Sequence, residues 1–408
     1  MKIKKAPHSN IKYELNSLSV RIWKKACVKL KEGIELISKA IDYIFIPIAM
    51  YYDKRGFNFY EVKVSALGHH LFEPIAIALI NKNKEIGLQK KITLLVSKND
   101  ALVPYTNTIL KQQFNIIEKY SFLNLEYWLA RNLYCGISRN SDYKVFMDAH
   151  YRYRNQLNIF NLDYLNDDDT IKELIKTTNV DNRYIVVWKP RCYRSNKHYP
   201  SRYSGIESIV PIIEQIYSNG GLVYGLLYGN AELEHPGLYD LRRIKNNSLR
   251  AKFVYYLDYN CKYAITGQTG GGVPQIIFLK PILAYDLALP YSLHFSGPKT
   301  IIAPKKAQYK DGKYVDLQTL LNLKNEKQIE QLNISFINNS PNDMVNLHLE
   351  LLERIEKYPK EFAENSYMMN NDWGELIPRN IYNSFGHSQI ADYSYLLNKN
   401  TLFPKWKS

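Results

Sequence analysis

The stretch "YAITGQTGGGVPQIIFLKP", residues 263–281, decides the fold class. A short apolar segment ends at Thr266, four of the next six residues are glycine, and a second apolar segment starts at Val273. Pro274 suits the first turn of a helix, where its missing N–H costs no hydrogen bond. A strand, a glycine loop and a helix in this order are typical of a parallel α/β sheet, whose ligands bind beyond the carboxyl ends of the strands.

The same pattern extends through the second half of the chain. Apolar segments of strand length lie at 184–188, 222–228, 281–286 and 300–304. Pro211 is tolerated only near a helix start, so we expect a helix from Glu207 or Ser208. Gly220 and Gly221 then end this helix. The alternation predicts a doubly wound unit built on a parallel sheet.

The first half repeats this architecture without repeating the sequence. Its predicted elements are a strand at 58–67, a helix at 75–87, a strand at 91–97 and a helix at 107–122. We therefore expect an α/β protein with two Rossmann-like, doubly wound domains. The expected units are a helical N-terminal segment at 1–57, a first domain at 58–175, a second domain at 176–342 and a helical tail at 343–408.

Composition and charge narrow the function classes. Of the 408 residues, 46% are hydrophobic and 23% are charged, which is typical of a globular chain and excludes a disordered one. The net charge of +15 indicates a polyanionic partner, such as a nucleic acid, an anionic lipid surface or a phosphorylated ligand. We expect no nucleic acid, because RNP, KH, zinc-finger and helix-turn-helix signatures are missing, although that hypothesis stays open.

The cysteines and the N-terminal region bear on location. The four cysteines are widely spaced without a CxxC pair, which indicates neither a zinc site nor a disulfide framework. Since no secretory signal is recognisable, we expect a cytoplasmic protein. The segment "GIELISKAIDYIFIPIAMYY", residues 33–52, is interrupted by three charged residues and falls short of a spanning helix. It either lies peripherally on the anionic inner face of the cytoplasmic membrane or packs on its own domain.

Three consecutive aspartates, Asp167–Asp169, precede the helical stretch "TIKELIK". Clustered carboxylates can bind a metal ion. They can also cap a helix, because an Asp at the N-cap accepts hydrogen bonds from free N–H groups and interacts favourably with the helix dipole. We favour capping and expect no metal here.

The glycine loop is the first candidate site. Gly270, Gly271 and Gly272, with Thr269 before them, leave N–H groups at a helix start accessible to phosphate oxygens. The spacing matches neither GxGxxG nor the Walker pattern, which excludes a Rossmann dehydrogenase and an ordinary P-loop ATPase. A tight turn without a ligand is the alternative interpretation.

The second candidate is the basic loop "WKPRCYRSNKHYPSRYSG", residues 188–205. It follows a predicted strand and carries Lys189, Arg191 and Arg202 to the same sheet edge as the glycine loop. Arg binds a diphosphate with two parallel hydrogen bonds, whereas Lys acts as a point charge. A solvated basic loop is the alternative.

The third candidate, "ALGHHLFEP" at residues 66–74, lies at a predicted strand-to-helix junction in the first half. Gly68 permits a tight turn there. His69 or Glu73 could take a proton from a hydroxyl group, and His70 would lie nearby. Adjacent histidines cannot both face one ligand, so we expect at most one to be catalytic. The alternative role is a hydrogen bond at the helix start.

These stretches, in this order, resemble a family of bacterial glycosyltransferases from surface-polysaccharide and lipopolysaccharide gene clusters. Members carry an H-V-R loop after a strand, Y-R-N before a helix, a G-T-T-S-G…V-P loop, F-G-x-P and x-P-K. The matching stretches here are "WKPRCY", "SRYSGIESIVPII", "ITGQTGGGVPQIIFLKPIL" and "TIIAPKK", with a G-H loop at Gly68 and "SQIADYSYLLNKN" near the end. The resemblance covers most of the chain from residue 58 onward.

The resemblance implies a GT-B-like transferase, in which two Rossmann-like domains face each other across a cleft and the tail crosses back to the first domain. A nucleotide-sugar donor would lie on the second domain, and a glycan or lipid-linked glycan acceptor would approach Gly68 and His70 on the first. His69 or Glu73 would be the base, and Arg191 would stabilise the leaving diphosphate. The resemblance implies no cofactor and no metal. The implied diphosphate-binding residues are Lys189, Arg191, Arg202, Thr269, Gly270, Gly271 and Gly272.

The sequence departs from the family at three positions. Trp188 or Lys189 stands where the family has His, Tyr203 where it has Asn, and Gly270 where it has Ser. These departures leave a second hypothesis open, namely an inactive relative that acts as a non-catalytic scaffold at the membrane.

Overall fold

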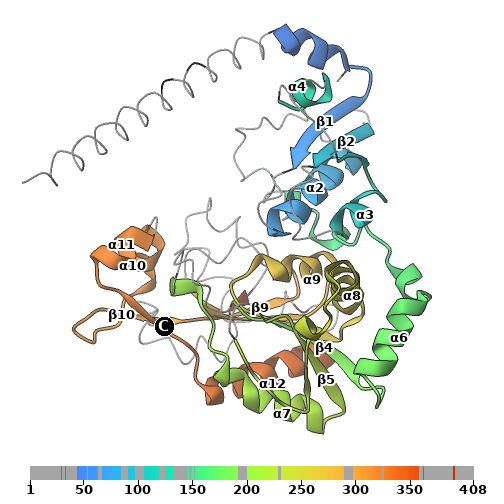
Figure 1. Ribbon diagram of the computed structural model, residues 1–408. Coiled ribbons are helices and arrows are strands. Elements are labelled where there is room, and N and C mark those ends of the chain that lie inside the picture. Colours follow the sequence, from blue (N-terminus) through green and yellow to red (C-terminus); the bar gives the residue numbers. More distant parts are fainter. Residues whose placement is uncertain are drawn as a thin grey trace, which may run out of the picture.

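The computed structural model has an α/β architecture with two parallel sheets flanked by helices, as predicted (Figure 1). It describes residues 29, 33, 44–52, 54–62, 67–83, 91–96, 105–118, 125–131, 146, 149–150, 152–191, 200–227, 231–288, 297–323, 326–357, 362 and 389–390. Among these residues, no helix combines the length and the apolar character needed to cross a membrane.

The first sheet has three parallel strands in the order β1-β2-β3. Its strands are β1 (Phe57–Val62), β2 (Lys91–Val96) and β3 (Asn115–Ile117), and its helices are α2 (Leu67–Lys82), α3 (Thr106–Leu110) and α4 (Leu125–Arg131). Strand β3 replaces the second part of the helix predicted at 107–122, so that prediction is wrong. The β-branched pair Ile116 and Ile117 aligns with Leu94 and Leu95 of β2, and this pairing outweighs the helical pattern.

Helix α2 begins eight residues before the predicted start at residue 75. The stretch around Gly68 is therefore helical and forms no tight turn. Pro74 lies inside the helix, where it removes the hydrogen bond to the carbonyl of His70. The helix persists because Ile75 and Leu79 are fully buried in the core, and this packing outweighs the local cost of the proline.

The second sheet has seven strands in the order β12-β9-β8-β7-β4-β5-β6, and every pairing is parallel. Its strands are β4 (Tyr184–Lys189), β5 (Gly221–Gly225), β6 (Leu238–Asp240), β7 (Tyr263–Thr266), β8 (Ile282–Leu287), β9 (Thr300–Pro304) and β12 (Gln389–Ile390). A separate antiparallel pair comprises β10 (Lys306–Gln308) and β11 (Ser335–Ile337).

The other described helices lie between residues 154 and 357. The α-helices are α6 (Asp169–Thr178), α7 (Val210–Ser218), α8 (Asn247–Asn260), α9 (Val273–Ile277), α10 (Leu317–Asn322), α11 (Glu326–Gln331) and α12 (Pro341–Lys357). The 3₁₀ helices are η1 (Arg154–Gln156), η2 (Asp163–Asn166), η3 (Pro200–Arg202), η4 (Glu207–Ile209), η5 (Leu241–Arg243) and η6 (Gly270–Gly272). Pro211 lies in the first turn of α7, as predicted, and Gly220 after its end has a φ of 78°.

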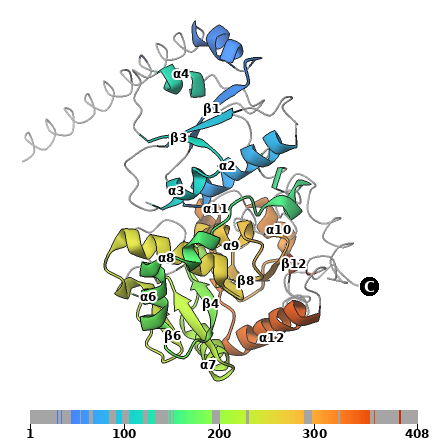
Figure 2. The same cartoon turned by 90° about the vertical axis from the view of Figure 1, so that its right-hand side faces the viewer.

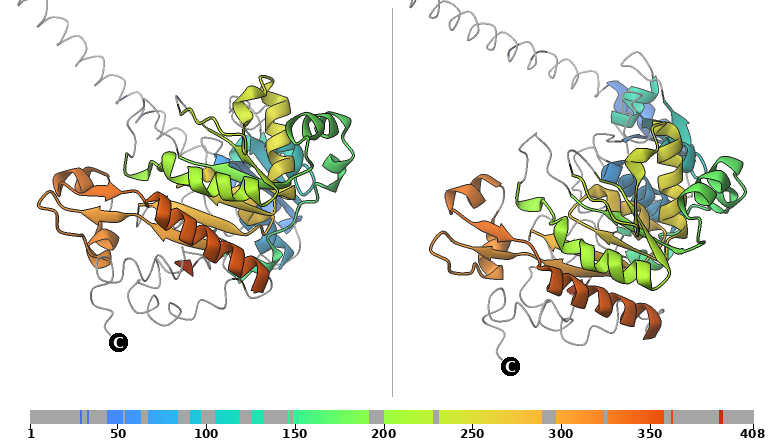
Figure 3. Two further views of the ribbon diagram at one scale, coloured as in Figure 1. Left: turned by 90° about the horizontal axis from the view of Figure 1, so that it is seen from below. Right: turned by 60° about the horizontal axis from the view of Figure 1, so that its bottom comes forward.

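Side chains of successive strand residues enter two cores, one on each face of the second sheet. Val187 packs in the core beneath α8 and α9, whereas Val186 and Trp188 pack in the core beneath α7 and α12. Figure 3 shows α7 and α12 running side by side on their face. Because both faces are covered, the strands read as continuous apolar runs in the sequence.

The described parts of the tail lie on the second domain. Helix α12 packs on α7 and β8, and β12 forms the edge strand beside β9. The crossing of the tail back to the first domain stays a prediction, because residues 358–361 and 363–388 lie outside the described residues. Residues 391–408 lie outside the described residues.

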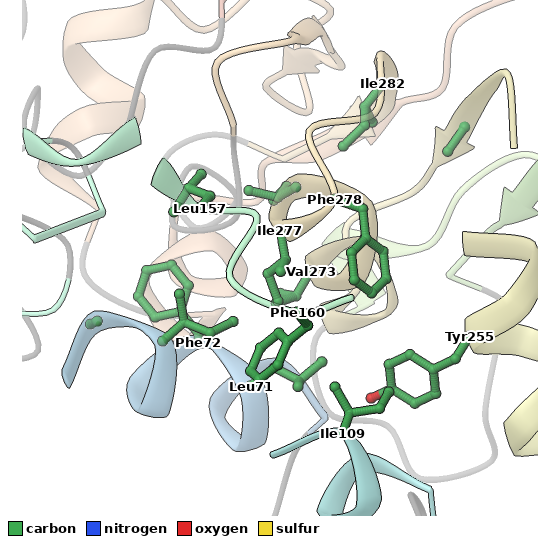
Figure 4. Close-up of a cluster of buried hydrophobic side chains, with 14 of the residues drawn as sticks. Leu71, Phe72, Ile109, Leu157, Phe160, Tyr255, Val273, Ile277, Phe278 and Ile282 are labelled. Carbon is green, nitrogen blue, oxygen red and sulfur yellow. The ribbon is translucent and has the colours of Figure 1, made fainter. Parts of the chain in front are cut away.

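The two domains share a buried interface. Helix α2 of the first domain contacts both η6 and α9 of the second, and Figure 2 shows α2 directly above α9. In Figure 4, Leu71 and Phe72 lie beside Val273 and Ile277 across this interface. The hydroxyl groups of Thr106 and Tyr255 are 2.7 Å apart, and this buried hydrogen bond adds a polar link between α3 and α8.

One of the three aspartates caps helix α6. Asp168 is the N-cap, and its carboxylate accepts a hydrogen bond of 3.2 Å from the N–H of Ile171. The hydrogen bond from Lys252, a cation in α8, is the main reason that the pKa of Asp168 is lowered to about 2. In the described part of the chain, no group of three or more His, Cys, Asp or Glu side chains is arranged to hold a metal ion.

Replacing Asp168 with Ala is expected to lower the free energy of unfolding by about 1 kcal/mol, because the α6 N-terminus loses its cap. Asp167 is a matched control: its carboxylate is 91% exposed and 3.8 Å from Lys172, so Asp167→Ala should change stability little. Because the folded-state pKa of Asp168 is depressed, its contribution is present above its unfolded pKa of 3.8 and is lost as the pH falls toward 2. Urea unfolding at neutral and acidic pH measures both effects; equal losses in the two variants would contradict the capping role.

Candidate active site

Two loops meet at the carboxyl ends of the adjacent strands β4 and β7. Lys189 and Thr266 are partners in the parallel pairing, so both chains leave the sheet side by side. The N–H of Gly267 donates to the carbonyl of Lys189 at 2.9 Å, and the Nη1 of Arg191 donates to the carbonyl of Gln268 at 3.0 Å. The structure thus brings the glycine loop and the start of the basic loop together, as predicted. Residues 192–199 of the basic loop lie outside the described residues.

The glycine loop forms the short helix η6, which leads directly into α9. Its N–H groups are partly satisfied by Thr269, the N-cap of η6: the hydroxyl of Thr269 accepts from Gly271 at 3.3 Å, and its carbonyl accepts from Gly272 at 3.2 Å. The helix start is therefore less open than the sequence predicts. Thr269 and Gly270 are half-buried, whereas Gly271 and Gly272 are buried.

Of the glycines in this loop, Gly267 leaves the least space for a side chain, and it was not among the predicted site residues. A Cβ atom at Gly267 would lie 2.2 Å from the Oγ of Ser204 and 2.8 Å from the backbone nitrogen of Arg191. At Gly271 a Cβ would lie 3.3 Å from the Cδ of Lys189, and at Gly272 it would make only ordinary contacts at 3.5 Å. Because Gly267 and Gly271 lack side chains, the basic loop of the protein can pack directly against the glycine loop. In the sequence, the first glycine of "TGQTGGG" was the feature from which this close approach could have been predicted.

Lys189 occupies a buried position that differs from the predicted one. Its side chain is 1% exposed, and its ammonium lies 2.6 Å from the carboxylate of Asp258 in α8 and donates to the carbonyl of Gly271 at 2.9 Å. Gln275 donates to the second carboxylate oxygen of Asp258. Burial raises the pKa of Asp258 to about 6, although Lys189 acts to lower it. This geometry supports a structural role for Lys189, which ties the glycine loop to α8, instead of direct contact with a diphosphate.

Among the described residues of the basic loop, Arg191 and Arg202 are the arginines that the structure places near this sheet edge. Both are half-buried. The carbonyl of Arg191 accepts from the N–H of Ser204 at 3.0 Å, which brings the segment after η3 next to the glycine loop. Two guanidinium groups on adjoining segments can offset the negative charge of a phosphate ester or diphosphate.

A buried polar network fixes the backbone around Arg202. Lys305 is 3% exposed, and its ammonium donates to the carbonyls of Ser201 and Tyr203, with a distance of 2.9 Å to the first. Asp286 accepts from the N–H of Gly205 at 2.8 Å. Lys305 was not among the predicted site residues, although its motif "TIIAPKK" belongs to the family resemblance.

Asp286 itself stands out in the fold. It has a φ of 54° and lies where the register between β8 and β9 shifts. It also accepts from the N–H and the side-chain amide of Asn339, at 2.7 Å and 2.9 Å. Burial raises the pKa of the Asp286 carboxyl group. In the sequence, the one carboxylate inside the apolar run "PILAYDLAL" could have indicated this buried network. A charged side chain is buried only where hydrogen-bond donors or opposite charges compensate it.

The first-domain candidates lie in the first two turns of α2. Glu73 is 1% exposed and accepts from the hydroxyl of Tyr60 in β1 at 2.6 Å. The Nε2 of His70, also buried, is 2.9 Å from the Oδ1 of Asn107 in α3. Both bonds lie within the first domain, so the geometry supports structural roles for Glu73 and His70. The backbone of Gly68 and His69 belongs to the first turn of α2, and the side chain of His69 is outside the described part.

Helix α2 of the other domain lies against η6, beside the two loops that meet at this sheet edge. Arg191, Arg202, Thr269 and Gly270 keep partial exposure there. Buried pairs such as Lys189 with Asp258 hold the loops in place without adding net charge. Chemically, such an edge can stabilise a leaving phosphate or diphosphate group.

No protein-family model and no curated protein matches this chain. Among solved structures, the chain is similar to the Escherichia coli ADP-heptose lipopolysaccharide heptosyltransferase II, with 13% identity over 73% of this chain and 99% of that one and a TM-score of 0.37. It is similar to a family 9 glycosyl transferase from Veillonella parvula, with 11% identity over 73% and 97% of the two chains and a TM-score of 0.40. A UDP-GlcNAc 2-epimerase from Methanocaldococcus jannaschii, in complex with UDP-GlcNAc and UDP, gives 13% identity over 67% and 79% and a TM-score of 0.22. All three TM-scores are low, and these likenesses carry no argument for an activity of this chain.

Proposed function

We propose that this chain is a GT-B-like glycosyltransferase that moves a hexosyl or related sugar from a nucleotide-sugar donor to a bacterial surface glycan, such as lipopolysaccharide or capsule. The observation that carries the proposal is the contact between Arg191 and the glycine loop at the carboxyl ends of β4 and β7, where Nη1 is 3.0 Å from the carbonyl of Gln268. Ligands of open α/β sheets bind at this edge. The ordered motif resemblance of the sequence supports the same class.

Arg191 and Arg202 would bind the donor diphosphate and stabilise its charge as it leaves, which makes a bound metal unnecessary. The hydroxyl of Thr269 and the backbone of Gly270 would contact the same group. On the acceptor side, His69 stays the predicted base; its support is that helix α2, whose first turn includes His69, contacts η6 of the other domain. Glu73 has less support for that role, since Tyr60 already engages its buried carboxylate.

Replacing Arg191 with Ala is expected to weaken nucleotide-sugar binding about 10- to 100-fold, because hydrogen bonds to a charged phosphate are worth roughly 1.5–3 kcal/mol. Isothermal titration with the best-binding nucleotide sugar gives the affinity. Arg191→Lys keeps the positive charge but loses the planar guanidinium. Its donor affinity should lie between those of the wild type and Arg191→Ala.

Lys262→Ala is a matched control, because this exposed lysine lies directly before β7, at the end of the strand opposite the glycine loop, and its loss removes the same charge. It should bind the donor like the wild type. If Arg191→Ala bound the donor with unchanged affinity while remaining folded, the assignment of the diphosphate site would be wrong.

A further inference from the structure

Exposed large hydrophobic side chains gather at one end of the first domain. Of the twelve such residues in the described part of the chain, five lie between residues 44 and 57. They are Ile44, Ile48, Met50, Tyr51 and Phe57, with Ile44 68% exposed and Tyr51 56% exposed. Single exposed apolar residues are ordinary on a protein surface, but a local cluster indicates an interaction site.

The cluster has a helical order. Residues 44–52 are helical, so Ile44, Ile48 and Tyr51 follow one another on one face, which we call the apolar face. On the opposite side Ala49 is buried. The helix therefore packs on the protein with one side and leaves the apolar face exposed.

Aromatic contacts fix this helix to the first sheet. The ring of Tyr52 meets the rings of Phe57 and Phe59 edge-on, with centroids 6.4 Å and 6.1 Å apart. The N–H of Lys91 in β2 donates to the carbonyl of Gly56 at 2.8 Å. The apolar face is thus presented by a segment joined to the sheet.

Positive charge borders the apolar face. Lys54 and Arg55 are exposed directly after it, and the guanidinium of Arg55 lies 5.3 Å from the centre of the Tyr51 ring. In the sequence, residues 1–32 contain nine Lys or Arg and two Glu. Apolar and aromatic side chains beside basic ones are the composition of helices that lie in the interface of an anionic membrane.

We propose that the apolar face docks on an anionic lipid surface, with Lys54 and Arg55 at the headgroups. A second copy of the chain fits this surface less well, because two copies would bring the same positive charges together. A nucleic acid would match the charge but would not bury isoleucine side chains. The proposal does not depend on the sugar transfer proposed above.

Flotation of the full chain with vesicles tests the proposal. We expect it to bind vesicles of phosphatidylcholine and phosphatidylglycerol about tenfold more strongly than phosphatidylcholine alone, and to lose most of this preference in high salt. In the triple variant Ile44→Ser, Ile48→Ser, Tyr51→Ser, the affinity for anionic vesicles should fall at least about tenfold. Lys54→Glu with Arg55→Glu should likewise weaken binding.

The matched control replaces three exposed apolar residues elsewhere, namely Val180→Ser, Leu332→Ser and Leu349→Ser, and should float like the wild type. The affinity for nucleotide sugars should be the same in all variants. A failure of the lipid-docking proposal can therefore be distinguished from a failure of the proposed sugar transfer. The proposal is overturned if the wild type does not bind anionic vesicles, or if the apolar-face and control variants bind equally. It is also overturned if the apolar face instead mediates self-association without lipid, seen by light scattering.

Discussion

Replacing Lys189 with Met is expected to lower the free energy of unfolding by about 3–5 kcal/mol, which is a large part of the stability of an ordinary protein. The reason is the carboxylate of Asp258, which is fully buried 2.6 Å from the Lys189 ammonium and would lose its counter-ion. The carbonyl of Gly271 would lose its donor as well. Urea unfolding followed by circular dichroism measures the change.

The double variant Lys189→Met, Asp258→Asn is the control for this result. It removes both charges, so its stability should return to within about 1–2 kcal/mol of the wild type. The penalty of the single variant should also shrink at low pH. Burial already raises the pKa of Asp258 to about 6, and without Lys189 the folded state gains still more from protonating it. A single variant that is as stable as the wild type would show that the pair does not hold the glycine loop.

Replacing Gly267 with Ala is expected to separate the two loops of the proposed active site. The added Cβ would lie 2.8 Å from the backbone nitrogen of Arg191, and a backbone atom cannot rotate away. We expect a loss of about 1–3 kcal/mol in stability, typical of overpacking. Donor affinity should fall about tenfold or more, because groups that bind one diphosphate would be misplaced.

Gly272→Ala is the matched control in the same loop. The added Cβ would make ordinary contacts at 3.5 Å from Thr266, and the φ of Gly272 is −79°, which suits alanine. This variant should be as stable as the wild type or up to about 1 kcal/mol more stable. Thermal unfolding and donor titration of both variants give the comparison. Equal behaviour of the two would mean that the close approach at Gly267 does not matter.

The strands β4, β5, β7, β8 and β9 of the second domain could be predicted from sequence because their signals were local, whereas the short strands β6, β10 and β11 were not predicted. The strand that begins at Tyr184 and the strand that begins at Tyr263 are continuous apolar runs, and Pro211 and Gly220 mark the ends of α7. The meeting of the glycine loop with Arg191 followed from the rule that parallel strands end at one edge.

The roles of individual polar residues could not be predicted in this way, because their partners are distant in the chain. Lys189 and Asp258 are 69 residues apart, and Lys305 reaches the carbonyl of Ser201 across 104 residues. From the sequence alone, a lysine at the end of a strand is interpreted as a phosphate ligand. Only the structure reveals the buried carboxylate beside it. The same limit applies to α2, whose start at Leu67 depends on core packing that outweighs Pro74.

The most direct test of the proposed function is a titration of the folded wild-type protein with UDP-, GDP-, CMP-, ADP- and dTDP-sugars, followed by saturation-transfer NMR. We predict that at least one of them binds and that its nucleotide product competes with it, because the phosphate groups would contact Arg191 and the glycine loop. This product is the nucleoside diphosphate for UDP-, GDP-, ADP- and dTDP-sugars, and CMP for a CMP-sugar. If the folded protein gave no signal with any of these nucleotide sugars, that result would contradict the assignment of this sheet edge as a donor site.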